Sequence, residues 1–349
     1  LSTAGGSGTN RLNQTLVGNI TLTGNSTITN NGNSLFDIDG QIDLGANTLT
    51  YQADGTGSRI DGNISGSGGS LNKTSAQDLL LTGTNTYTGT TTITGGRLQF
   101  ANQASLYNNV ASNWTAANIN VKSGGTIAFN VGGTGEFTTS DVTTLLTNFA
   151  VSSSATSGMN SGSNFGFDTA NASGGSFTIA DVIADSTGAS GGARGLVKLG
   201  ANALVLTNAN TYTGATSVSA GTLVLANTGA VQNTPSISLA NGTALQLSTD
   251  SAFATFPALT GSSGSSGTTI VSDRATAGVG LNHVLGSASL GANTFNFTGG
   301  SNVTSGSAGI TFSNLSMSSG ATGTLTLNPT TATLTITGGV TGTGSAVAR

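Results

Sequence analysis

A segment of thirty residues occurs twice in the chain. Residues 71–100 align without a gap on residues 196–225, and 14 of the 30 aligned residues are identical. A repeat that keeps its spacing in this way is typical of architectures in which neighbouring copies stack on one another. The repeat positions are a lysine, two leucines, an asparagine, a tyrosine and two glycines in each copy: Lys73, Leu79, Leu81, Asn85, Tyr87, Gly89 and Gly96, then Lys198, Leu204, Leu206, Asn210, Tyr212, Gly214 and Gly221.

Within the second copy, apolar and polar residues alternate with a period of two residues. The runs 204–206, 216–218 and 223–225 each place their apolar or threonine side chains at every second position, which predicts three short strands. Asn and Gly between the runs favour corners. No helical pattern separates the strands and hairpin signals are sparse, so one copy fits a coil of a β-solenoid better than a β-sandwich. Similar pairs of strands are predicted at 119–121 with 127–129, 237–239 with 245–247 and 324–327 with 334–336.

These coils predict an all-β fold, a β-solenoid that forms a single domain over residues 1–349. With about 4.8 Å between neighbouring strands, about fifteen coils would build a rod on the order of 70 Å long. Leu, Val, Ile and Phe would form its inner columns. The asparagines at equivalent corners, Asn85 and Asn210, would stack in amide ladders like those of cross-β assemblies.

One stretch departs from the coil pattern. Residues 140–149 carry apolar side chains at helical spacing behind Ser140 as the predicted N-cap residue, so a short helix is expected there. Residues 150–176 resemble a loop. We therefore predict that 130–190 is an irregular excursion from the solenoid.

The composition narrows the classes of function. Charged residues are 6% of the chain, with a single histidine, no cysteine and a net charge of −4. Cysteine-based metal sites and disulfides are excluded, and no basic stripe is present that would neutralise nucleic acid. No apolar stretch reaches the length of a membrane span, so no transmembrane segment is predicted.

The repeat also carries a family resemblance. Residues 64–100 read as a glycine-rich lead, Leu-x-Lys, Leu-x-Leu, Asn-Thr-Tyr-Thr-Gly and Gly-x-Leu. This order resembles the autotransporter-associated β-strand repeat of bacterial passenger regions, with copies at 64–108 and 190–233. The resemblance implies a right-handed parallel β-helix, an extracellular or cell-surface location in a Gram-negative-type bacterium, and a structural or adhesive role.

Acidic residues are the first candidates for a site. Asp37, Asp39 and Asp43 lie close together in the sequence and offer oxygen ligands that suit Ca²⁺; no other cofactor is expected. Asp37 and Asp39 also have the spacing of a glycosidase carboxylate pair. The simpler interpretation of all three is a solvated corner.

Four further candidates each have a simpler interpretation. Asp54, Arg59 and Asp61 suit an acid and base around a sugar, or a surface ion pair. Ser190 lies in a Gly-x-Ser-x-Gly pattern that chance alone predicts in this composition, outside the strand-to-helix setting of a hydrolase. His283 has no clustered His or Cys that would complete a metal site, and its simpler interpretation is a residue at the edge of the core or on the surface. The equivalent aromatics Tyr87 and Tyr212 would stack on sugars or pack at the repeated corner.

The sequence thus predicts a non-catalytic extracellular rod for surface attachment or fibrous matrix, with end-to-end self-association into filaments and contact with glycans or cell surfaces. One alternative is a protein that binds or degrades polysaccharide. A second is binding of ice or mineral through threonine rows, suggested by Thr333, Thr335 and Thr337. Against it, the Thr-x-Thr pattern does not recur at one fixed coil length.

Overall fold

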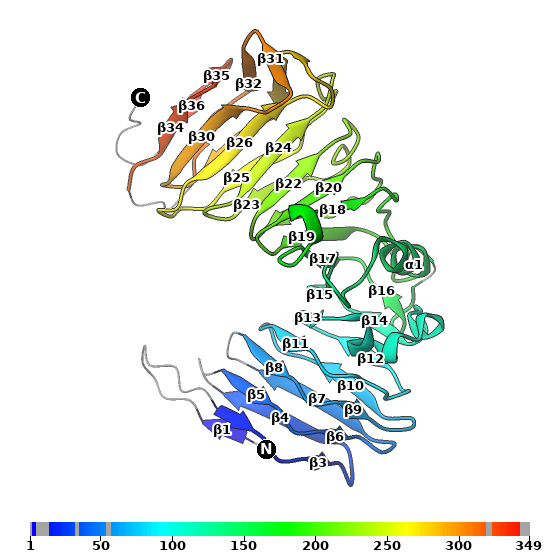
Figure 1. The fold of residues 1–349 in the computed structure, drawn as a ribbon. Coiled ribbons are helices and arrows are strands. Elements are labelled where there is room, and N and C mark those ends of the chain that lie inside the picture. The colour runs from blue at the N-terminus through cyan, green and yellow to red at the C-terminus, as the bar shows by residue number, and fades with distance from the viewer. Residues whose placement is uncertain are drawn as a thin grey trace. The chain divides into compact units, whose positions relative to one another are not determined.

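The computed structural model describes residues 2–4, 14–31, 35–53, 57–151, 153–318 and 323–342. Over these residues the chain is a parallel β-solenoid of about 13 turns with one α-helix, which confirms the predicted fold class. The chain divides into two compact units (Figure 1). Unit 1 comprises Leu1–Gly166 and Asp185–Arg194, and unit 2 comprises Phe167–Ala184 and Gly195–Arg349.

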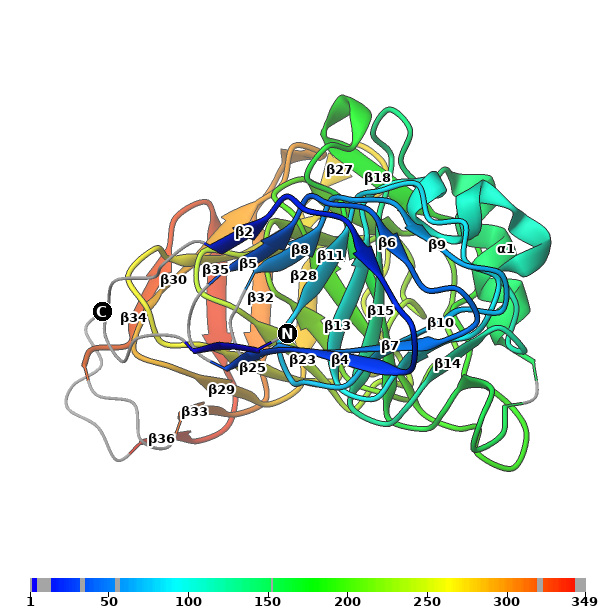
Figure 2. The ribbon, with the colours of Figure 1, turned by 90° about the horizontal axis from the view of Figure 1, so that it is seen from below.

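Unit 1 has three faces, each a stack of parallel strands (Figure 2). The first face contains β1 (Ser2–Ala4), β4 (Ser26–Asn31), β7 (Thr48–Ala53), β10 (Ser70–Lys73), β12 (Thr91–Ile93), β14 (Ile119–Val121) and β16 (Gly158–Met159). The second contains β2 (Gln14–Leu16), β5 (Phe36–Ile38), β8 (Ser58–Ile60), β11 (Leu79–Leu81), β13 (Gly96–Phe100), β15 (Gly125–Asn130) and β17 (Ser163–Asp168), whose last two residues belong to unit 2. The third contains β3 (Ile20–Thr21), β6 (Ile42–Asp43) and β9 (Ile64–Ser65).

The core of unit 1 is a set of columns, because the parallel register places one inward side chain directly beside the next. One column runs through Ile38, Ile60, Leu81, Phe100 and Phe129, all fully buried. Burying each such side chain stabilises the fold by about 1.5–3 kcal/mol. The outward neighbours of these residues are polar in most coils, which is the alternation that the sequence shows.

Unit 2 is also built from stacks of parallel strands, and its later coils contain additional strands. One face contains β18 (Ser176–Ile179), β20 (Ala203–Leu206), β22 (Thr222–Leu225), β24 (Ala244–Ser248), β26 (Thr268–Asp273), β30 (Thr294–Gly299) and β34 (Thr326–Pro329). Another contains β19 (Arg194–Leu199), whose first residue belongs to unit 1, β21 (Thr216–Val218), β23 (Ser236–Leu239), β25 (Ala258–Gly261), β29 (Ala288–Leu290), β33 (Leu315–Met317) and β36 (Val340–Thr341). The later coils add β28 (Asn282–Leu285), β32 (Ala308–Phe312) and β35 (Ala332–Ile336), and the pair β27 (Gly278–Val279) and β31 (Val303–Ser305).

The predicted helix is present as α1 (Thr139–Phe149), which lies beside β14 and β16 of unit 1 in Figure 1. Its apolar side chains are buried as expected. The predicted N-cap was wrong: Thr138 caps the helix, because its hydroxyl accepts from Asp141 N while the Asp141 carboxylate accepts from Thr138 N. Ser140 is the second helical residue.

The loop predicted at 150–176 is also partly wrong. Residues 158–159 form β16, which pairs with β14, and residues 163–168 form β17. The excursion is therefore made of segments inserted between strands that keep their places in the stack. One short 3₁₀ helix, Ser173–Gly175, belongs to this excursion. Three others precede it, between β13 and β14: Gln103–Ser105, Tyr107–Asn109 and Ala111–Asn113.

Two equivalent glycines turn the corner before the last strand of each repeat. Gly96 and Gly221 have φ angles of 61° and 65°, a region that side-chain-bearing residues rarely adopt. A Cβ at Gly96 would lie 2.3 Å from Gln77 O, and one at Gly221 would lie 2.5 Å from Ala201 O. Both corners therefore require glycine for conformation and for space.

Candidate functional site

Asn85 and Asn210 occupy the same buried corner in the two repeats. The Asn85 Oδ1 accepts from Ile64 N at 2.9 Å in the preceding coil, and its Nδ2 donates to Ser105 O at 2.7 Å in the following coil. Asn210 does the same between Ile183 N and Ala230 O, both at 2.9 Å. One side chain thus joins three successive coils.

The amide ladder predicted for Asn85 and Asn210 does not form. Each amide is saturated by the backbone of its neighbouring coils, where no strand pairing satisfies those groups. A buried amide with both ends bonded stabilises a corner more than stacking on another amide, because unpaired backbone groups in the interior are costly.

Tyr87 and Tyr212 lie two residues after these asparagines and are buried to 1% exposure. Their hydroxyls form 2.6 Å hydrogen bonds with Thr91 Oγ1 and Thr216 Oγ1, respectively. Burial raises the pKa of Tyr212 to about 12. Both rings pack at the repeated corner, and neither offers a face to a sugar.

Lys73 and Lys198 are fully buried, which the sequence pattern does not reveal. The Lys73 ammonium donates to Ser75 O at 2.6 Å, to Ser75 Oγ at 3.0 Å and to Gly95 O at 3.3 Å. The Lys198 ammonium donates to three carbonyls: Leu199 O at 2.6 Å, Gly200 O at 2.7 Å and Ala220 O at 3.1 Å. Each lysine therefore closes one corner and ties it to the next coil.

The environment of Lys198 shows the cost of this arrangement. Burial lowers the pKa of Lys198 to about 8, and the nearby Asp168 carboxylate opposes that shift. The carbonyl oxygens around Nζ compensate for part of the lost hydration. The lysine acts as a tethered cation inside the wall of the solenoid.

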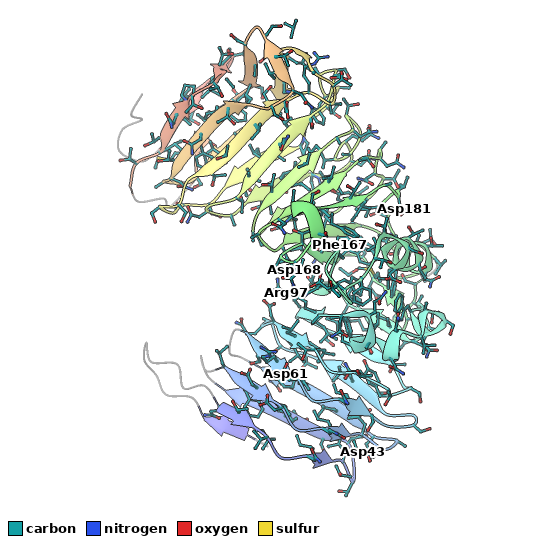
Figure 3. All side chains as sticks on the ribbon, in the orientation of Figure 1. Asp43, Asp61, Arg97, Phe167, Asp168 and Asp181 are labelled. Carbon is teal, nitrogen blue, oxygen red and sulfur yellow. The ribbon has the colours of Figure 1, made fainter. Side chains whose placement is uncertain are left out.

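The structure does not gather Asp37, Asp39 and Asp43 into a metal site. Asp37 lies on β5 beside Arg59 of β8, whereas Asp43 lies at the end of β6, far from Asp61 in Figure 3. Asp43 Oδ1 accepts from Gly45 N at 2.9 Å in a local turn. Among the described residues no three His, Asp or Glu side chains lie close enough to hold a metal ion. Ca²⁺ binding here stays a prediction from sequence.

The environment of Asp37 on β5 shifts the pKa of its carboxyl. Burial raises the pKa of its carboxyl, Arg59 opposes the shift, and Asp61 and Asp39 add to it. Arg59 itself bonds Asp61, with Nη2 and Oδ1 2.7 Å apart, on a partly exposed surface. This is the predicted surface ion pair. Asp54 lies outside the described residues.

Ser190 lines an open hollow of about 540 Å³ in unit 1 together with Lys122, Ser123, Asn160 and Ser161. The remaining lining residues are Thr94 and Ala155, so the hollow contains neither a histidine nor a carboxylate. Ser190 lies in a turn, with no helix after it. The hollow has no histidine or carboxylate that would activate the hydroxyl, and the Lys122 ammonium in it donates to Ala155 O.

His283 is fully buried on β28, which the sequence did not predict. Its Nδ1 lies 2.8 Å from Ser272 Oγ, and its Nε2 lies 3.0 Å from Thr249 Oγ1. Each hydroxyl also lies within hydrogen-bond distance of a backbone carbonyl, Ser272 Oγ of Leu281 O and Thr249 Oγ1 of Ser251 O. A neutral ring has one donor and one acceptor nitrogen, so one hydroxyl donates to the ring and the other is free to donate to its carbonyl. Burial lowers the pKa of His283 to about 4, against a smaller opposing effect of Asp273.

Arg194 is another buried group that the sequence did not indicate. Its Nη1 donates to Phe149 O at 2.9 Å, at the end of α1, and its guanidinium carbon lies 5.2 Å from the centre of the Phe165 ring. Burial lowers its pKa to about 10. Arg194 holds α1 to the coils of unit 1 and has no counterpart in the repeat, so no sequence signal marks it.

The first prediction concerns the buried lysines. Replacing Lys198 by Met should lower the free energy of unfolding by about 2 kcal/mol, because buried carbonyls lose their charged donor. Lys122→Met is the matched control, since Lys122 is only half-buried. Chemical denaturation of the full chain measures both. Equal losses in the two variants, or none for Lys198→Met, would show that the buried ammonium is not structural.

The second prediction concerns pH. The folded pKa of His283, about 4, lies below the unfolded value of about 6.5, so the unfolded chain binds more protons between these values. The stabilisation is complete above pH 6.5 and is lost as pH falls toward 4. We expect a loss of about 2 kcal/mol between pH 7 and pH 5. His283→Gln should remove this slope, and a variant that keeps the full slope would refute the assignment.

Comparison with known proteins gives one match. The model of the passenger-associated transport repeat matches residues 71–100 and 196–225. No curated protein and no solved structure matches the chain significantly. The matched segments run from β10 to β13 and from β19 to β22, and they contain the equivalent asparagine, tyrosine and lysine corners described above. The chain therefore carries two copies of the passenger-associated transport repeat, as an autotransporter-passenger repeat protein does.

Proposed function

We propose that this chain is a secreted structural rod at the surface of a Gram-negative bacterium, serving attachment or a fibrous matrix. The observation that carries the proposal is how the two passenger-associated transport repeats use their polar residues. Each is a set of consecutive coils whose distinctive polar residues, Lys, Asn and Tyr, are buried and bonded inside the wall. Because these Lys and Asn side chains bond neighbouring coils to each other, they indicate a structural role for the repeat.

The outer surface supports the same proposal. Charged residues are 6% of the chain, and Lys73, Lys198 and Arg194 among them are buried. The tyrosines and the tryptophan are buried as well, so they present no stacking platform for a polysaccharide. Contact through hydroxyl and amide groups is favoured over turnover of a substrate. Within the described residues, no helix has the length and apolar character to cross a membrane.

End-to-end association is the finer part of the proposal, and the last coil of unit 2 supports it. Leu327 and Leu334 occupy inward columns but are only half-buried, whereas their neighbours Phe295 and Ile310 in the preceding coil are fully buried. The first coil of unit 1 is similar: Leu16 is half-buried beside the fully buried Ile38. Open columns and strand edges favour stacking of a further coil, and we propose that a second copy of this chain supplies it.

The third prediction tests this association. The purified chain should form filaments or larger species as its concentration rises, measured by sedimentation velocity and electron microscopy. Leu334→Lys should prevent this, because it places a charge in the column where the next copy would stack. Val205→Lys is the control, since Val205 is half-buried on the outer side of the internal strand β20. A monomer at all concentrations, or equal loss in both variants, would contradict end-to-end assembly.

A further inference from the structure

The outer side of the first face of unit 1 carries a regular array of short polar side chains, here called the threonine face. Its central column runs through Thr27, Thr50, Asn72 and Thr92 on β4, β7, β10 and β12. These residues alternate with buried ones, such as Ile28, so they point away from the core.

Two further columns flank the central one. The first runs through Asn25, Thr48, Ser70 and Thr90, and hydrogen bonds from Thr48 N to Asn25 Oδ1 and from Thr90 N to Ser70 Oγ connect its members. The second runs through Thr29, Gln52, Thr74 and Thr94. All these side chains are exposed or half-buried, and none is charged or aromatic.

Register, and not sequence spacing, creates this array. The central residues lie 23, 22 and 20 positions apart along the chain, so no fixed period marks them. The strands nevertheless align, because segments of unequal length are accommodated between the faces. By contrast, the Thr333, Thr335 and Thr337 pattern continues poorly in the preceding strands, since Gly309 lies beside Thr333, and the pair of Thr335 and Thr311 is followed by Val284.

The array has two fixed spacings. Neighbouring strands lie about 4.8 Å apart, and alternate residues along a parallel strand lie about 6.6 Å apart. Threonine is stiff at χ1 because its Cβ is branched, and the backbone ladder holds every column in place. The threonine face therefore presents threonine hydroxyls at regular spacings, interrupted by Asn25, Gln52, Ser70 and Asn72.

We propose that the threonine face binds ice. With O–H···O distances of about 2.75 Å and tetrahedral angles, alternate oxygens of an ice layer lie about 4.5 Å apart, within about 0.3 Å of the strand spacing. Along the strands the same geometry gives a repeat of about 7.3 Å, against about 6.6 Å between columns, so the match is closer across the strands than along them.

The chemistry of the face favours this partner over others. An ionic partner finds no opposite charge there, and a single sugar chain finds no aromatic ring on which to stack. An uncharged lattice of hydrogen-bonding groups is complementary to an uncharged lattice of water. This inference goes beyond the rod function and is independent of it, since affinity for ice is a property of the purified chain.

The experiment uses the full chain, labelled with a fluorophore, and measures its uptake into a growing ice hemisphere together with inhibition of ice recrystallisation. Thr50→Tyr and Thr92→Tyr each raise a ring above the plane of the threonine face. Ser238→Tyr and Ser289→Tyr are matched controls, because both serines are half-buried on the outer sides of β23 and β29 in unit 2. Circular dichroism melting confirms that each variant is folded.

The expected result is uptake of the wild-type chain into ice, loss of uptake in Thr50→Tyr and Thr92→Tyr, and uptake unchanged in the two serine variants. Exclusion of the wild-type chain from ice would overturn the proposal without any variant. Equal loss in all four folded variants would show that the threonine face is not the binding surface. Binding to crystalline cellulose or chitin without uptake into ice would assign the face to a polysaccharide surface instead.

Discussion

The hydrogen bonding of each coil to the next is the interaction on which the rest of this structure depends. Along the faces, parallel strands provide it through their backbones. At the corners the chain bends and strand pairing stops, so side chains must satisfy the freed backbone groups. Asn85 and Asn210 do this with an amide that spans three coils, and Lys73 and Lys198 do it with an ammonium held by backbone carbonyls.

This constraint determines what the protein can offer to its surroundings. Several side chains of the types that usually carry chemistry are instead buried and hydrogen-bonded within the fold, namely Lys73, Lys198, Arg194, His283, Tyr87 and Tyr212. The outer faces retain mainly threonine, serine and asparagine at spacings set by the strands. An outer surface with few charged groups and with polar side chains at regular spacings follows from this division.

The period-two alternation and the repeat were sufficient to predict a solenoid and the strands of each repeat, the family resemblance implied that its strands are parallel, and helical spacing predicted the apolar face of α1. They were not sufficient for contacts between coils, which depend on a register that coils of unequal length conceal. The roles of Asn85 and Lys73 and the threonine face are of this kind. His283 and Arg194 are single buried groups without a repeated counterpart, so nothing in the sequence distinguishes them from surface residues.

Amide hydrogen exchange at Ile64 and Ile183 tests the central claim most directly, because the side chains of Asn85 and Asn210 are the acceptors for these two amides. We expect both amides to be protected as strongly as those inside neighbouring strands, and to lose that protection in Asn85→Ala and Asn210→Ala, respectively. Exchange in the wild-type chain as fast as that of exposed turns would contradict the account, since the corners would then not be joined by these side chains.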